Sequence, residues 1–198
     1  WVSGELAATG TELELVVVTG PTDPIEPDVV ESFEDTDFWK NWSVDNGTWE
    51  WGNPTSGPGQ AHDKNNVVAT ILNGNYGDNT SSRLVSPSFV VPDAVDNPRL
   101  RFWHCYWFDC DDSGQVQIKA VGGNWQTLVE FSGYSGGTWS YTWLDLSGYV
   151  GQNVQVGFYF YSHDNGSCNY PNWDVSAGWY LDELELRTGP TIFNNPES

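Results

Sequence analysis

The chain has 198 residues, and its seven Lys and Arg against 27 Asp and Glu give a formal net charge of −20. Nucleic acids and anionic membranes are bound through Lys and Arg, so this charge argues against both as partners. The carboxylates instead suit Ca²⁺, a cation that prefers oxygen ligands. No run of 18 apolar residues is present, and the sequence therefore predicts no membrane insertion.

The first 20 residues predict an N-terminal β arm. They contain one strand-like run, residues 12–18, with no local partner in the sequence pattern. A single strand is not stable alone in water, so this run must add to another sheet, in this chain or in a second copy. The residues of this assembly strand that we single out are Glu12, Leu13, Leu15 and Val17.

Residues 21–30 hold three prolines and three acidic residues, which predicts an extended linker. The main domain is predicted from residue 31 to residue 187, and residues 188–198 form a polar tail. There is no initiating Met and no signal-peptide pattern, so we expect a mature or excised product of an exported protein whose signal lies upstream.

Within the domain, short alternating runs are separated by Gly, Asn, Asp and Pro, and helical periodicity is nearly absent. This pattern is typical of an all-β sandwich. The predicted strands cover residues 12–18, 48–52, 66–73, 83–91, 98–108, 115–121, 125–131, 139–146, 153–162 and 178–187.

Seven segments of the domain resemble a known group of extracellular jelly-roll domains. They are residues 31–34, 49–58, 68–76, 82–87, 100–104, 145–152 and 178–184. The group comprises the cleaved-adhesin and choice-of-anchor-type domains, which are related to MAM domains and occur beside secreted bacterial peptidases. The resemblance covers roughly 155 residues and implies a jelly-roll β-sandwich secreted to the cell exterior or cell surface.

The resemblance also implies a structural Ca²⁺ that ties the first strand of the domain to the last. Glu34 and Asp182 match the positions of its ligands, and Asp63 could complete the set together with backbone carbonyls. The alternative is that these acids only solvate loop ends. Where similar domains usually carry a second Asp after the one matched by Asp182, this chain has Glu183.

A second acidic group is formed by Asp109, Asp111 and Asp112, with Asp164 and Asp174 from a later loop. Carboxylates brought together repel one another unless a cation or protons intervene, so a second calcium site is one interpretation. A solvated acidic rim explains the same residues equally well in a chain this acidic.

Catalytic patterns are missing from the sequence. It contains no G-x-S-x-G elbow, P-loop or Rossmann fingerprint, and its histidines, His62, His104 and His163, form no metal-binding pair. His104 alternates with apolar residues of strand 98–108, which predicts a core histidine. We therefore expect a protein that is not an enzyme.

Aromatic side chains are the most informative feature. Alternation along strands 98–108, 139–146 and 153–162 sends one set of side chains inward and leaves an outward set with many rings. If these strands share a sheet, its outer face carries a ligand-binding patch that includes Trp103, Trp107, Tyr141, Trp143, Tyr159 and Tyr161. The patch could bind a glycan, could be covered by the N-terminal strand, or could be buried under residues 163–176 as part of the core.

Three cysteines permit one disulfide. Cys110 and Cys168 lie in loops beyond the ends of strands 98–108 and 153–162, and we favour a bridge between them; Cys105–Cys110 is the competing pair.

These features predict a non-catalytic, calcium-stabilised module for adhesion or for binding a polysaccharide or cell-surface glycan. The alternative is a structural subunit of an extracellular filament or surface layer, in which residues 12–18 complete the sheet of the next copy.

Overall fold

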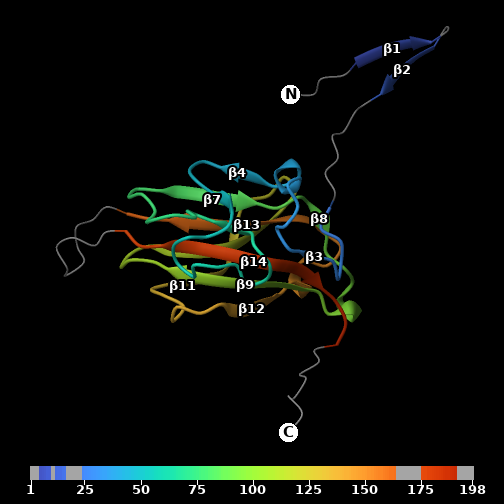
Figure 1. Ribbon diagram of the computed structural model, residues 1–198. Coiled ribbons are helices and arrows are strands. Elements are labelled where there is room, and N and C mark those ends of the chain that lie inside the picture. The colour runs from blue at the N-terminus through green and yellow to red at the C-terminus, as the bar shows by residue number, and fades with distance from the viewer. Residues whose placement is uncertain (1–4, 10–11, 17–23, 164–174, 191–198) are drawn as a thin grey trace.

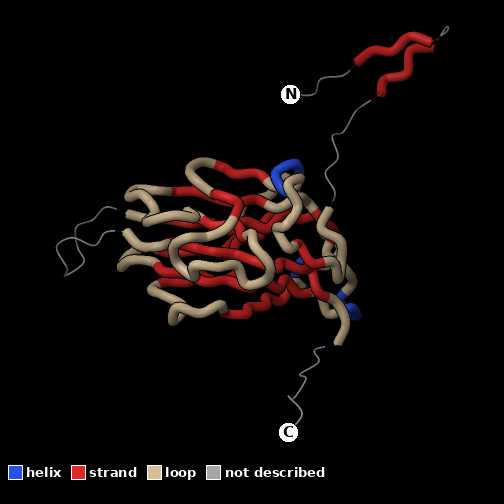
Figure 2. The backbone as a smooth tube through the Cα atoms, in the orientation of Figure 1, coloured by secondary structure: helices blue, strands red, loops and turns tan. Residues whose placement is uncertain are grey.

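The computed structural model describes residues 5–9, 12–16, 24–163 and 175–190 and is almost entirely β-structure (Figures 1 and 2). Two antiparallel sheets pack face to face, as the all-β prediction requires. Short 3-10 turns are found at η1 (Phe38–Lys40), η2 (Ala94–Asp96) and η3 (Ser147–Tyr149). Within the described part of the chain, no helix is long and apolar enough to cross a bilayer.

The first sheet, called here the β9–β14 sheet, has the strand order β12-β9-β14-β6-β5, and β3 pairs with β14. Its long central strands are β9 and β14, and β12 lies at one edge (Figure 1). The strands are β3 (Val30–Glu31), β5 (Glu50–Gly52), β6 (Val67–Ala69), β9 (Arg99–Trp107), β12 (Ser140–Asp145) and β14 (Gly178–Arg187).

The second sheet, called here the β10–β13 sheet, has the order β11-β10-β13-β7-β4, and β8 pairs with β13. Its central strands β10, β13 and β7 are flanked by β11 and β4. The strands are β4 (Ser43–Asp45), β7 (Ser81–Val85), β8 (Phe89–Val90), β10 (Ser113–Ala120), β11 (Gln126–Ser132) and β13 (Asn153–Tyr161).

The core lies between the sheets and is built by period-two alternation. From β13, the inward side chains Val154, Val156, Phe158 and Phe160 are fully buried, as predicted. Leu100 and Phe102 of β9 meet them from the opposite sheet, and the Phe102 ring contacts the Phe158 ring edge-on at 5.3 Å between centroids. A dense aromatic core therefore holds the two sheets together.

Most of the predicted strands are confirmed, with ends shifted by a few residues and with 83–91 divided into β7 and β8. The pattern missed three short strands: β1 (Glu5–Thr9), β3 and β4. Two of these are only two or three residues long, too short to show alternation.

The expectation that the N-terminal strand lacks a local partner is wrong. Its observed form, β2 (Glu12–Val16), pairs antiparallel with β1, with Thr9 opposite Glu12 and Glu5 opposite Val16. Among the described strands, β1 and β2 form a two-stranded sheet of their own (Figure 1). Val17, the last residue of the predicted assembly strand, lies outside the described residues.

The predicted linker also reaches further into the fold than expected. Pro27 forms a bridge to Leu186, and the amide of Asp28 donates to the Leu186 carbonyl at 2.8 Å. Val30 then lies opposite Glu185 in the β3–β14 pair. Residues 27–30 are thus part of the sandwich edge, because β14 offers them unpaired backbone groups.

Candidate ligand-binding faces and carboxylate sites

The six aromatic residues predicted to form one patch lie on two different sheets. Trp103, Trp107, Tyr141 and Trp143 belong to β9 and β12, whereas Tyr159 and Tyr161 belong to β13 in the opposite sheet. The condition that these strands share one sheet is therefore not met. Alternation along a strand shows which side chains share a face, but it does not show which sheet the strand joins.

Residues 53–66 cover the centre of the outer face of the β9–β14 sheet. Ala61 is buried in a cluster with Cys105 and Tyr180, and the Trp139 indole N–H donates to the Gln60 carbonyl at 3.3 Å. Trp107 packs edge-on against Tyr180 at 6.3 Å and is half-buried there. Trp107 is thus packed partly against the protein itself, in contact with Tyr180.

At the β12 edge of the same sheet, aromatic rings stay accessible. Trp143 is 53% exposed and Tyr141 is 39% exposed, and both project from the outer face of β12. The Tyr141 ring lies 5.0 Å from Trp103 and has the Arg101 guanidinium 4.4 Å above it. We call these four residues, Arg101, Trp103, Tyr141 and Trp143, the aromatic rim.

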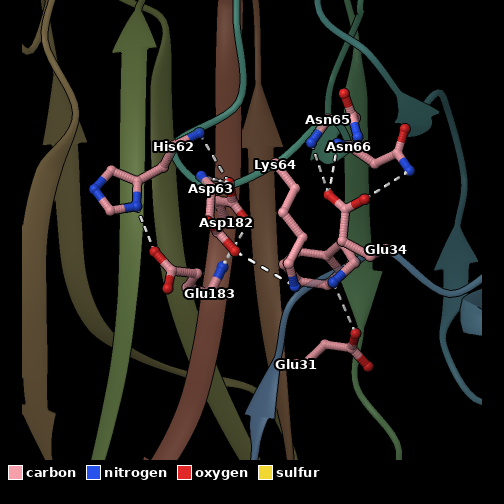
Figure 3. Close-up of polar contacts among 10 residues, drawn as sticks. Glu31, Glu34, His62, Asp63, Lys64, Asn65, Asn66, Asp182 and Glu183 are labelled. Atoms are coloured by element: carbon pink, nitrogen blue, oxygen red, sulfur yellow. Dashed lines mark hydrogen bonds and ion pairs between the residues drawn. The ribbon is translucent and has the colours of Figure 1, made fainter.

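His62 closes the inner side of the aromatic rim. Its imidazole stacks on Trp103 with ring centroids 3.8 Å apart. Figure 3 shows the contact of its Nδ1 with the Glu183 carboxylate. The inner side of the Trp103 ring is therefore occupied by the protein itself. Trp143 and Tyr141 are therefore the more exposed rings of the rim.

The outer face of the β10–β13 sheet carries a second aromatic group, centred on Trp125 in the turn before β11. The Arg83 guanidinium lies 4.7 Å from the Trp125 ring and 4.8 Å from the Tyr159 ring, and Lys119 Nζ lies 4.5 Å from Trp125. We call Arg83, Lys119, Trp125 and Tyr159 the cation–aromatic group. Of these, only Tyr159 was singled out from the sequence.

Side-chain hydrogen bonds fix this second group in place. Arg83 Nε donates to Gln117 Oε1 at 2.9 Å, and Gln117 Nε2 donates to Gln115 Oε1 at 2.8 Å. A Cβ atom at Gly157 would lie 2.5 Å from Arg83 Cδ and 3.0 Å from the Trp125 ring. The absence of a side chain at Gly157 therefore allows Arg83 and Trp125 to lie close to the sheet.

Two of the predicted metal ligands, Glu34 and Asp182, both contact the loop of residues 62–66 (Figure 3). Asp182 is fully buried on β14, and its carboxylate accepts the amides of His62 at 2.9 Å and Asp63 at 3.1 Å. Glu34 accepts the amides of Asn65 at 3.0 Å and Asn66 at 2.8 Å. Both carboxylates thus hold residues 62–66 against the sandwich.

Burial raises the pKa of the Asp182 carboxyl to about 6, although three backbone amides favour its charged form. Among the described residues, no basic side chain forms an ion pair with Asp182 or Glu34. A buried carboxylate without a cationic partner is costly. Asp182 and Glu34 thus supply carboxylate oxygens, the type of ligand that Ca²⁺ prefers.

Asp63 does not fit the ligand set as predicted. Its carboxylate is half exposed and pairs with Lys64 Nζ at 3.5 Å, while its backbone amide serves Asp182. In the described part of the chain, no three His, Cys, Asp or Glu side chains are grouped so as to hold a metal. The Asp63 side chain thus pairs with Lys64, and the backbone of Asp63 is the part that contacts Asp182.

The second acidic group is divided by burial. Asp112 is buried, accepting the Tyr76 hydroxyl at 2.5 Å and the His163 amide at 2.9 Å, so its carboxylate organises the loop. Asp111 is exposed and Asp109 half-buried. The remaining members, Asp164 and Asp174, lie outside the described residues, as do Tyr170 and Trp173 of the loop expected to cover the aromatic face.

The cysteines are distinguished by their state. Cys105 is a buried free thiol, and Cys110 is disulfide-bonded, which excludes the Cys105–Cys110 pair. Cys168 lies outside the described residues, and the Cys110–Cys168 bridge stays a prediction.

His104 is the core histidine that alternation predicted. It is 2% exposed, and burial lowers its pKa to about 4. Its Nε2 lies 3.0 Å from the Thr142 hydroxyl, and its ring contacts Phe131 at 4.5 Å. A neutral imidazole in this position serves packing.

Sequence reasoning missed Arg83, Arg101, Lys119 and Trp125, since it followed aromatic alternation and did not follow the few cations. A signal was present: the segments that became β7, β10 and β13 contain no Asp or Glu, in a chain with 27 of them. Such a gap in an acidic sequence marks a locally different surface.

Comparisons with known proteins agree with this architecture. No protein-family model matches the sequence. Over 155 residues, the chain is 33% identical to Bacillopeptidase F of Bacillus subtilis (strain 168), covering 76% of this chain and 10% of that protein. The chain thus spans about a tenth of the length of this relative.

Two solved structures are similar in fold. The K1 cleaved adhesin domain of Lys-gingipain from Porphyromonas gingivalis W83 has a TM-score of 0.52 and 19% identity, covering 82% of this chain and 98% of that one. TmCBM61, solved in complex with β-1,4-galactotriose, has a TM-score of 0.54 and 15% identity, covering 80% and 94%. The chain therefore has the jelly-roll β-sandwich fold of the cleaved adhesin domains, shared with carbohydrate-binding modules.

Proposed function

We propose that this chain is a non-catalytic extracellular module that binds polysaccharide through the aromatic rim, as part of a larger exported protein. The observation that carries the proposal is the pair Tyr141 and Trp143, two exposed rings on the same face of an edge strand. Residues two apart on a strand are about 7 Å apart, so the two rings can contact successive parts of one extended chain.

The chemistry of the rim suits a sugar ring. Aromatic side chains provide a large apolar contact area, and those that stay exposed in a group commonly mark a binding surface. Arg101, stacked on Tyr141, adds fixed N–H donors at its border. The rim thus combines flat apolar faces with oriented donors, as saccharide hydroxyls require.

The fold comparison supports a binding role. TmCBM61 has the same fold and was solved with β-1,4-galactotriose. The K1 domain, also of this fold, is a cleaved adhesin domain of a larger protein. Both suggest attachment to a glycan or a surface, while the site itself has to be argued from this chain's residues.

We also propose that Ca²⁺ binds between Glu34 and Asp182, with loop backbone oxygens completing its shell. A cation there would neutralise two carboxylates that no basic side chain in the described structure neutralises. It would hold residues 62–66, and with them His62 against Trp103. The cation would therefore stabilise the position of Trp103 in the aromatic rim through its contact with His62.

Affinity electrophoresis on gels containing neutral polysaccharides, including β-1,4-galactan, tests the binding role. We expect retardation of the wild-type chain on at least one gel and its loss in Trp143→Ala. The matched control is Tyr134→Ala, which removes a ring that is 66% exposed but outside the rim. Equal retardation of wild type and Trp143→Ala would remove the rim as the site.

The filament alternative has lost its original premise, since Glu12–Val16 pairs with Glu5–Thr9 in this chain. Strand donation would first require that hairpin to open. It stays a prediction, and size-exclusion chromatography tests it.

A further inference from the structure

The centre of the β10–β13 sheet differs in charge from the rest of the molecule. Strands β7, β10 and β13 carry no Asp or Glu but hold two of the seven basic residues, Arg83 and Lys119. The acids of this sheet lie on its flanking strands, Asp45 on β4 and Glu130 on β11. Asp45 pairs with Arg83 and Glu130 accepts from Gln115, so the positive charge of this sheet that no described carboxylate pairs with is that of Lys119.

Lys119 is exceptional among the cations. Five of the seven form ion pairs with carboxylates, and Arg99 donates to the backbone carbonyls of Asn97 and Gly189. Lys119 has no ion pair within the described part of the chain; its ammonium lies over the Trp125 ring. With carboxylates so abundant, a lysine left without one leaves its positive charge available to a ligand.

The register of β10 and β11 places Lys119 far from Glu130, the acidic residue of the neighbouring strand. Gln115 lies opposite Glu130 and bonds to it at 2.9 Å, whereas Lys119 lies opposite Gln155 on β13. Four residues along a strand span about 13 Å, more than one Debye length at physiological salt. The field of Glu130 is therefore weak at Lys119.

The side chains along this sheet are of the kind that contact a saccharide. Trp125 lies beside Lys119, and Tyr159 lies further along the sheet, opposite Gln115. Rings such as these contact the apolar faces of a sugar, and the network of Arg83, Gln117 and Gln115 holds them in place. A site for a bare anion would need only the cations.

We propose that the cation–aromatic group binds an anionic oligosaccharide, with Lys119 contacting its charged group, Trp125 contacting the sugar ring beside that group and Tyr159 contacting a ring further along. This second site is independent of the aromatic rim, because it lies on the opposite sheet. The charged group can be a uronic-acid carboxylate or a sulfate ester, which share the chemistry that an ammonium recognises.

Isothermal titration with short oligosaccharides tests the proposal, since short probes limit long-range repulsion from the acidic chain. The probes are trigalacturonate for the carboxylate, a sulfated trisaccharide for the sulfate, and neutral galactotriose for comparison. We expect one charged probe to bind more tightly than galactotriose. Lys119→Gln should weaken that binding about tenfold, as expected for loss of a hydrogen bond to a charged group.

Three variants make the result specific. Lys40→Gln removes one exposed cation of a 3-10 turn and should leave binding unchanged. Trp125→Ala should weaken both the charged and neutral trisaccharides at this site. Trp143→Ala should leave trigalacturonate binding unchanged, so failure of the rim and failure of this site are distinguishable.

Equal binding of charged probes by wild type and Lys119→Gln overturns the proposal, as does no binding of either charged probe. A tetraglutamate peptide that binds as tightly as trigalacturonate would overturn the assignment to saccharides. Urea unfolding of each variant confirms that Lys119→Gln and Lys40→Gln retain wild-type stability.

Discussion

The outer faces of the two sheets handle charge in opposite ways. On the β9–β14 sheet, Asp182 is buried beneath residues 62–66, and its carboxylate is satisfied by backbone amides. On the β10–β13 sheet, the central strands carry no acids, and Lys119 and Arg83 lie against aromatic rings. One face uses its charges to hold its own covering loop, whereas on the other face Lys119 forms no ion pair within the described part of the chain.

This difference matters for how function is located in a very acidic protein. In a chain with many Asp and Glu residues, the presence of one more acidic residue does not identify a functional site. A buried acidic residue is informative, because Asp and Glu are rarely buried. A cation is rare enough that its partner, or lack of one, identifies its role. The comparison predicts that stability depends on the carboxylates of one sheet and that recognition of charge depends on the cations of the other.

The largest expected effect is that of Asp182→Ala. It leaves the amides of His62, Asp63 and Glu183 without their acceptor. We expect a loss of about 3–5 kcal/mol in the free energy of unfolding, as for breaking a buried polar network. Urea denaturation measures it. Asp63→Ala, at a half-exposed carboxylate, should cost less than about 1 kcal/mol, and equal losses in the two variants would contradict the assignment.

Acid sensitivity provides the next effect. The pKa of His104 falls from 6.5 in the unfolded chain to about 4 in the fold, so the unfolded state binds more protons between these values. Its contribution to stability is complete above pH 6.5 and is lost as the pH falls toward 4, by up to about 3 kcal/mol.

Urea unfolding at pH 4.5 and pH 7, for wild type and His104→Gln, isolates this contribution, because the effects of other groups cancel in the difference. His104→Gln should lose less stability on acidification than wild type. A parallel pH profile in the two proteins would show that the acid sensitivity does not arise at His104.

Calcium removal is expected to have a somewhat smaller effect. An ion present at 100 times its dissociation constant stabilises the folded state by about 2.7 kcal/mol. A chelator should therefore lower the melting temperature of wild type, measured by circular dichroism. Asp182→Asn should show little response, and an unchanged wild-type melting temperature would contradict the calcium proposal.

The smallest effect is expected at the N-terminus. Because β1 and β2 pair with each other, a chain lacking residues 1–23 should remain in the same oligomeric state as the full chain. Size-exclusion chromatography with light scattering over a range of concentrations measures this. Self-association of the full chain alone would favour strand donation over the binding role.

The sequence was sufficient for the fold class and for most strands, because alternation of Val, Phe and Tyr with polar residues is a local property. It also placed Phe158 and His104 in the core correctly. The candidate site was harder to predict from the sequence. The residues around Tyr159 and those around Trp103 show the same apolar–polar alternation, yet the two strands belong to opposite sheets. Sheet membership depends on long-range pairing, and alternation carries no information about it.

The packing of residues 53–66 on the β9–β14 sheet could not be predicted from the sequence either. Residues 53–66 have the composition of an ordinary surface loop, whereas in the structure their amides donate to Asp182 and Glu34 and hold the segment against the sheet. The resemblance to a family identified those two acids but not what they bind in this structure. Asp63, which we added to these two acids from its place in the loop, contacts Asp182 through its backbone amide.

The pairing of Val30 and Glu31 with Glu185 and Leu184 has a mechanical consequence. The chain enters the sandwich at β3 beside the point where β14 leaves it, and Thr188 donates to Asp28 across that point at 2.9 Å. Tension applied through both ends would load these bonds one after another, as in opening a zipper. In a longer chain under tension, the sandwich would lie to one side of the direction of the force. A weak force would then separate β3 from β14 before it disturbed the core.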